Sequence, residues 1–162
     1  MIVVADTSPL RYLILIEHVH VLPALYGRVV VPPAVIAELN QERTPDPIKT
    51  WLSDMPEWLR VQAPMQALTA PRVVLGWGER QAIALAAELS ADALLMDDRD
   101  GRQEAERLGV PVLGTLRVLV DASERGLAHR STAFDRLRGT NFRASEQLLK
   151  RLLEHSAHPR EE

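Results

Sequence analysis

Acidic residues occur at four places far apart in the sequence, each next to an apolar segment. A carboxylate at the edge of an apolar core is costly unless it is paired, hydrogen-bonded or close to a cation. Carboxylate oxygens are also the ligands that hard divalent metal ions prefer. We therefore expect these acids to converge on Mg²⁺ or Mn²⁺, a chemistry that suits hydrolysis of a phosphodiester bond. The residues are Asp6, Glu38, Glu79 and the pair Asp97 and Asp98.

Each acid taken alone has a simpler explanation. Asp6 suits the N-cap of the helix that follows it, a position that Asp favours. Glu38 suits an ordinary surface position, and Glu79 in the first turn of a helix complements the helix dipole. The segment 97–100 is different, because it holds three carboxylates in four residues. One of them is expected to cap the next helix, and like charges packed so closely repel one another unless a cation offsets them.

The acids lie at the ends of expected strands or near the beginnings of expected helices. Short apolar runs rich in β-branched residues are typical of strands buried on both faces. The expected strands are Ile2–Ala5, Arg28–Val31, Leu59–Val61, Ala93–Met96 and Val110–Leu113. Alternation with helices predicts a three-layer α/β fold with a mainly parallel sheet of about five strands. Sites in such folds lie at the carboxyl ends of the strands, where Asp6 and Asp97 fall.

Helical patterns follow most of these strands and continue beyond the last one. The expected helices are Pro9–Ile16, Val19–Tyr26, a helix opened by Pro32 and Pro33, Ile48–Leu52, Glu79–Leu89, Arg102–Leu108, a helix capped by Gly114 and Thr115 and running to Arg125, Ser131–Leu137 and Ser145–His155. We expect residues 1–126 to form the catalytic domain and residues 127–162 to form extra C-terminal helices packed on it. We expect Trp51, Trp58 and Trp77 in the core or at a dimer surface.

Composition limits the alternatives. The 162 residues suit one domain, and the absence of cysteine excludes disulfides, thiolate catalysis and zinc sites built on cysteine. No apolar run approaches the roughly 18 residues of a membrane span, so we expect a soluble, cytoplasmic protein. The net charge of −3 argues against a broad basic surface for nucleic acid. A few arginines near the acids can still bind phosphates, and the candidates are Arg80, Arg99 and Arg102.

The sequences around the acids resemble those of the PIN-domain ribonucleases. The segment VVADTSPL is similar to a family strand that ends in Asp with Ser or Thr nearby, and Glu38 lies in a V-x-x-E-L setting. Glu79 opens a helix before A-I-A-L-A, and the fourth acid lies in the run LLMDDRD, where Asp97 and Asp98 both align. The following G-x-P-V-x-G-T-L resembles the branch that holds VapC-like toxins and uncharacterised PIN proteins.

The resemblance implies a metal-dependent endonuclease that hydrolyses RNA. It assigns Mg²⁺ or Mn²⁺ to the five acids and suggests that Ser8 binds a metal-bound water or a phosphate. Many relatives are homodimers, and many are toxins blocked by a small antitoxin. A PIN fold kept only for binding RNA or protein is the alternative. A phosphatase of the haloacid dehalogenase type ranks lower, because it needs a second Asp where Ser8 stands.

Overall fold

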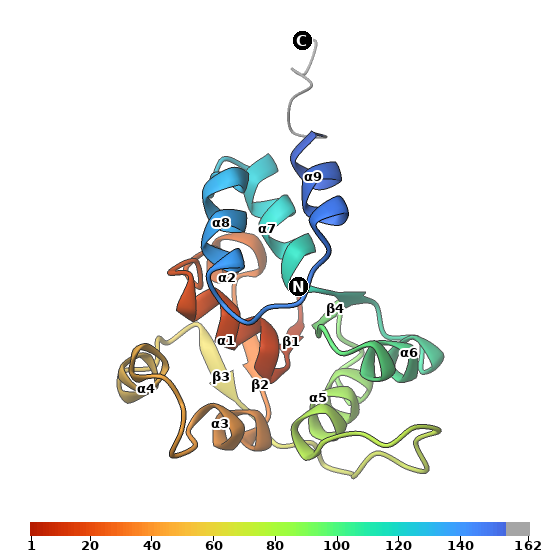
Figure 1. Ribbon diagram of the computed structural model, residues 1–162. Helices are drawn as coiled ribbons and strands as arrows, with labels where there is room; N and C mark the ends of the chain where they lie inside the picture. The colour runs from red at the N-terminus through yellow and green to blue at the C-terminus, as the bar shows by residue number, and fades with distance from the viewer. Residues whose placement is uncertain (155–162) are drawn as a thin grey trace.

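The structure is a computed structural model that describes residues 1–154, and its centre is one sheet (Figure 1). Within these residues five strands pair in the order β3-β2-β1-β4-β5, and every pair is parallel. The strands are β1 Val3–Ala5, β2 Val29–Val31, β3 Leu59–Val61, β4 Ala93–Leu95 and β5 Val112–Leu113. The predicted α/β fold with a parallel sheet is confirmed.

The order of the strands reverses at β1, which determines where a site can form. The chain adds β2 and β3 on one side of β1, then returns to add β4 and β5 on the other side. The last pair between β1 and β4 joins Ala5 to Leu95, and the Asp6 N–H donates to the Leu95 carbonyl at 2.9 Å. The residues that follow β1 and β4 therefore emerge side by side at the switch point, where ligands of open α/β sheets bind.

The described helices are α1 Thr7–Leu15, α2 Val21–Tyr26, α3 Pro33–Leu39, α4 Asp46–Ser53, α5 Trp77–Glu88, α6 Arg99–Arg107, α7 Thr115–Glu124, α8 Arg130–Arg138 and α9 Glu146–Glu154. Helix α5 begins at Trp77, two residues before the predicted start at Glu79. Helix α6 begins at Arg99 because the Asp98 carboxylate accepts a hydrogen bond from the Gly101 N–H at 2.8 Å. No described helix is both long and apolar enough to cross a membrane. The end of the last predicted helix, His155, lies outside the described residues.

Two apolar cores cover the two faces of the sheet, which confirms the three layers. Val3 and Ala5 point to the larger core, which includes residues of α1, α2, α7 and α8. Val4 points to the smaller core, which is closed by α5 and α6. This alternation is what a strand buried on both faces requires, because successive side chains point to opposite faces. Figure 1 shows α7 and α8 on one side of the sheet and α5 and α6 on the other.

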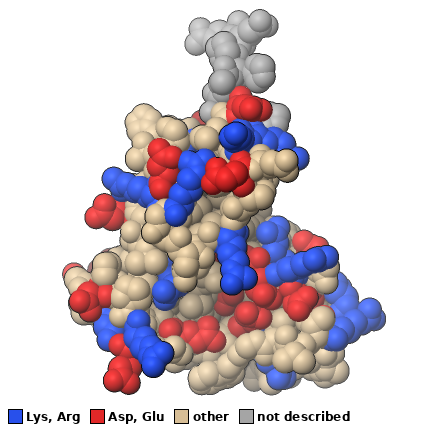
Figure 2. Space-filling view, viewed as in Figure 1, with Lys and Arg blue, Asp and Glu red and all other residues tan. Residues whose placement is uncertain are grey.

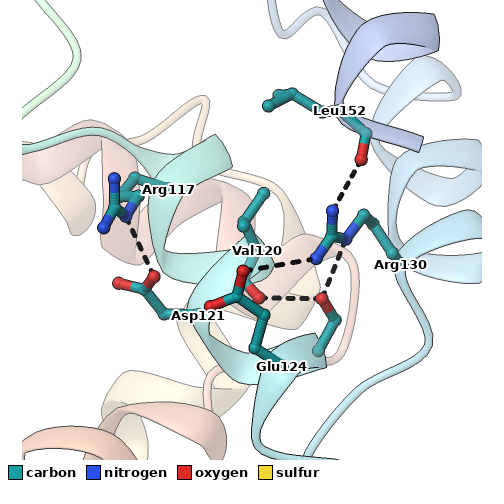
Figure 3. A network of polar contacts seen from close by, with 7 residues as sticks. Arg117, Val120, Asp121, Glu124, Arg130 and Leu152 are labelled. Atoms are coloured by element: carbon teal, nitrogen blue, oxygen red, sulfur yellow. Dashed lines mark hydrogen bonds and ion pairs between the residues drawn. The ribbon is translucent and has the colours of Figure 1, made fainter. Parts of the chain in front are cut away.

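The C-terminal helices are fastened to α7 by a nearly buried arginine. The Arg130 side chain is 7% exposed, and its guanidinium donates to the Leu152 carbonyl of α9 at 2.6 Å and to the Ser123 hydroxyl of α7 at 2.9 Å (Figure 3). Phe134 of α8 belongs to the same core as β1. The proposed division of the chain at residue 126 stays a prediction.

Candidate metal centre

Asp6 is the buried member of the acidic group. It follows β1 and is 3% exposed. It occupies the N-cap position of α1 but makes no capping hydrogen bond, so the capping explanation is wrong. Its Oδ1 atom is buried and has no hydrogen-bond partner among the described residues. Burial raises the pKa of Asp6 to about 7, against the lowering effect of a hydrogen bond from the Thr7 backbone, and the negative charges of Glu79, Glu38 and Asp97 add to the rise.

Glu38 of α3 is held by two donors from other elements. Its Oε2 atom accepts a hydrogen bond from the Thr7 hydroxyl at 2.6 Å, and its Oε1 atom accepts one from the Gly78 N–H at 2.9 Å. A Cβ atom at position 78 would lie 2.6 Å from both oxygens, so glycine is required for this close approach. The carboxylate thus joins the beginnings of α1 and α5, and it is not the free surface glutamate of the simpler explanation.

The two neighbouring acids after β4 have different partners. Asp97 accepts hydrogen bonds from the Thr115 N–H at 2.8 Å and from the Thr115 hydroxyl at 2.7 Å. Burial raises the pKa of Asp97, against the lowering effect of Thr115 and of the Arg102 charge. Asp98 instead caps α6. The charge of Asp97 contributes to the raised pKa of Asp6, and the charge of Asp98 contributes to the raised pKa of Glu79, so both acids lie close to the acidic group.

Glu79 lies in the first turn of α5 and faces a groove. Burial raises its pKa, followed by the charges of Asp98 and Glu38. The groove has a volume of about 720 Å³ and includes Ser8, Glu79, Asp97, Asp98 and Arg102 in its lining. In the space-filling view, Asp and Glu side chains gather in the middle of this face, with Lys and Arg side chains on the sides (Figure 2).

A segment of the C-terminal extension forms another wall of the same groove, which the sequence did not predict. Asn141, Phe142 and Arg143 line it. The segment is held to α1, because the Tyr12 hydroxyl donates to Asn141 Oδ1 at 2.8 Å and the rings of Tyr12 and Phe142 meet edge to face at 5.0 Å. Arg143 is exposed and forms no hydrogen bond or ion pair with the described residues, so its guanidinium is available to an anion.

The remaining predicted residues are more scattered. Arg80 is exposed on α5 and lines a different groove, and Arg99 is exposed at the start of α6 and lines neither. Within residues 1–154 no three His, Asp or Glu side chains are arranged as a ready metal site. The oxygens of Glu38 and Asp97 accept hydrogen bonds from protein donors. A cation bound to them would have to share these oxygens or turn the side chains.

Comparisons with known proteins agree with this architecture. A family model, DUF3368, described as a PIN domain, matches residues 2–158. The solved structure of a PilT N-terminus domain protein from the hyperthermophilic archaeon Sulfolobus solfataricus P2 is similar, with a TM-score of 0.55 and 24% sequence identity. The match covers 80% of this chain and 99% of that chain, and at this identity it shows the fold alone. No curated protein gave a significant match.

Proposed function

This chain belongs to the DUF3368 family of PIN domains, and on that premise we propose that it is a metal-dependent endoribonuclease. PIN domains are typically metal-dependent nucleases. One observation of this chain carries the proposal: the buried Asp6 carboxylate has an unpartnered oxygen and is surrounded by the charges of Glu38, Glu79 and Asp97. Such a group of acids is strained without a cation, because buried like charges repel one another.

The donor set fits Mg²⁺ or Mn²⁺, which both prefer oxygen ligands. We assign the metal to Asp6, Glu38, Glu79 and Asp97, with Asp98 as the less favoured candidate for the fourth position. A divalent ion held there would lower the pKa of a water molecule and so would supply the nucleophile for hydrolysis of a phosphodiester bond.

The other side chains of the site orient these acids and bind the substrate. Thr7 and the Gly78 N–H fix the Glu38 carboxylate, and Thr115 fixes Asp97. Arg102 and Arg143 line the same groove as Glu79, Asp97 and Asp98, and we propose that they bind phosphates of an RNA chain. Ser8 lines the same groove and can donate to a phosphate or to a metal-bound water.

A cleavage assay tests the proposal. Single-stranded and structured RNA are incubated with the protein and Mg²⁺, Mn²⁺ or EDTA, and the products are separated by size. Wild type is expected to cut with metal and not with EDTA, whereas Asp6→Asn and Glu79→Gln lose at least 100-fold in rate, as expected for groups that act on the metal. Asp54→Asn is the control, because this exposed acid at the end of α4 has no side-chain partner in the described structure. Full activity of Asp6→Asn would refute the mechanism.

The same assay distinguishes the two candidates for the fourth acid. Asp97→Asn is expected to abolish cleavage, whereas Asp98→Asn is expected to weaken the cap of α6 and to keep most of the activity. A role as the toxin of a toxin–antitoxin pair is a finer proposal that rests on the resemblance. It predicts growth arrest on expression and rescue by a small protein encoded beside the gene.

A further inference from the structure

Trp77 is a large aromatic side chain that the fold leaves in solvent. It is 64% exposed at the first position of α5. Trp51 and Trp58 differ, because their rings lie 6.0 Å apart and pack against the larger core. Exposed aromatic surface costs free energy in water and often marks a place where a ligand binds. Of the two places expected for Trp77, the core is therefore wrong, and a dimer surface stays a prediction.

A groove of about 490 Å³ lies beside this indole. That volume is in the range of small-molecule sites and suits a nucleobase with its sugar. The groove is lined by Pro64, Ala67, Leu68, Leu75, Trp77, Arg80, Gln81 and Ala84. The single charged group in this lining is the Arg80 guanidinium, so the groove joins an apolar surface to a positive charge.

Arg80 completes the chemistry that a nucleotide needs. It is exposed and forms no hydrogen bond or ion pair with the described residues. It follows Trp77 by three residues on α5, a spacing that places two side chains on the same side of a helix. Glu79 lies between them in sequence and lines the acidic groove instead. The first turn of α5 thus contributes to both grooves.

We propose that Trp77 and Arg80 form a nucleobase subsite for the RNA substrate. A base close to the cleaved bond stacks on the indole, and its phosphate binds the guanidinium. This inference rests on the proposed function. An RNA chain with a phosphate at Glu79 would also pass over the first turn of α5, where Trp77 and Arg80 lie. A second copy of the chain is the rival occupant. The groove's small size and its single unpaired cation favour a nucleotide over a protein surface.

Cleavage kinetics with Mn²⁺ and a short single-stranded RNA test the subsite. Stacking of one base on an aromatic ring is lost in Trp77→Ala, so KM is expected to rise about 5-fold to 100-fold while kcat stays within about 2-fold. Trp77→Phe keeps a stacking ring and is expected to restore most of the loss. Arg80→Ala is expected to raise KM and to reduce the salt dependence by about one phosphate contact. The controls are Val74→Ala, a 97% exposed apolar residue outside the groove, and Arg125→Ala, an exposed arginine at the end of α7.

An RNA with one abasic nucleotide, moved stepwise along the strand, identifies the base that stacks. For wild type, the abasic nucleotide is expected to raise KM at one place in the RNA. For Trp77→Ala, KM should not change when the abasic nucleotide is at that place. Equal KM values for wild type and Trp77→Ala would overturn the subsite. Loss of dimers in Trp77→Ala by light scattering, with unchanged KM, would also overturn it in favour of a second copy. If wild type cleaves RNA and Trp77→Ala has the same KM, the subsite fails but the proposed function stands. If wild type cleaves no RNA, both proposals fail.

Discussion

Replacing Asp6 with Asn is expected to stabilise the metal-free protein at neutral pH. The pKa of this carboxyl rises from 3.8 to about 7 on folding, so the folded protein keeps a proton that the unfolded chain releases between those values. The stability that this proton contributes is complete below pH 3.8 and is lost as the pH rises through about 7. The full effect is roughly 4 kcal/mol, of which roughly 2.5 kcal/mol falls between pH 5 and pH 8.

Urea unfolding in EDTA at several pH values between 5 and 8 measures this effect. The free energy of unfolding of wild type is compared with that of Asp6→Asn at each pH, so that titration of groups that do not interact with Asp6 cancels. From pH 5 to pH 8, the free energy of unfolding of Asp6→Asn is expected to rise by roughly 2.5 kcal/mol relative to that of wild type. Asp54→Asn, which removes an exposed carboxylate, should differ from wild type by a constant amount. A difference between wild type and Asp6→Asn that does not change with pH would refute the reasoning.

Adding Mn²⁺ to the same samples at pH 7 tests whether Asp6 binds the metal, apart from its repulsion of the neighbouring acids. A cation that binds only the folded protein stabilises it by about 2.7 kcal/mol at 100 times its dissociation constant. Wild type is expected to gain this amount, while Asp6→Asn gains much less because it lacks the buried ligand. Equal gains in both proteins would show that the metal binds elsewhere, and this readout does not depend on catalysis.

Three further changes test the residues around the acids. Thr115→Val keeps the N–H donor to Asp97 and removes the hydroxyl donor, so we expect roughly 1 kcal/mol lower stability by urea unfolding and weaker Mn²⁺ binding by calorimetry. Gly78→Ala displaces the Glu38 carboxylate, which is the end of a flexible side chain, so it should reduce cleavage strongly with little change in thermal stability. Gly76→Ala is the control, because a Cβ atom added there stays 3.9 Å from the nearest side-chain atom. Arg130→Met removes the two hydrogen bonds that the buried guanidinium donates to Ser123 of α7 and Leu152 of α9, so it should speed amide hydrogen exchange in α9. Unchanged exchange would contradict the role of Arg130 in holding α9 to α7.

The sequence predicted the parts of the site that local patterns determine. Asp6 and Asp97 could be placed together because each follows an apolar, largely β-branched or aliphatic run that reads as a buried strand, and parallel strands end at one edge of the sheet. The partners of the acids could not be predicted in the same way. Thr115 lies 18 residues after Asp97, and Gly78 lies 40 residues after Glu38. Hydrogen bonds over such separations depend on the packing of whole elements.

The case of Asp97 and Asp98 shows this limit most clearly. Both lie within three residues of the end of β4, and the sequence offers each of them as a helix cap or as a metal ligand. The choice depends on where α6 begins: Asp98 meets the Gly101 N–H three residues on, which leaves Asp97 to face Thr115. The core alternative for Trp77 failed for a related reason, because α5 begins two residues earlier than its buried stripe indicates.

The net charge of −3 gives little information about RNA binding, because the groove has its own local balance of charges. Glu79, Asp97 and Asp98 line it together with Arg102, Arg117 and Arg143. Four carboxylates repel a phosphate chain until cations offset them, and each divalent ion removes two negative charges. The arginines on the walls, Arg102 and Arg143, then dominate the local field. RNA affinity should therefore depend on metal as strongly as cleavage does. On the proposed function, the acids that look unsuited to a polyanion are expected to become its binding site only when the cation is present.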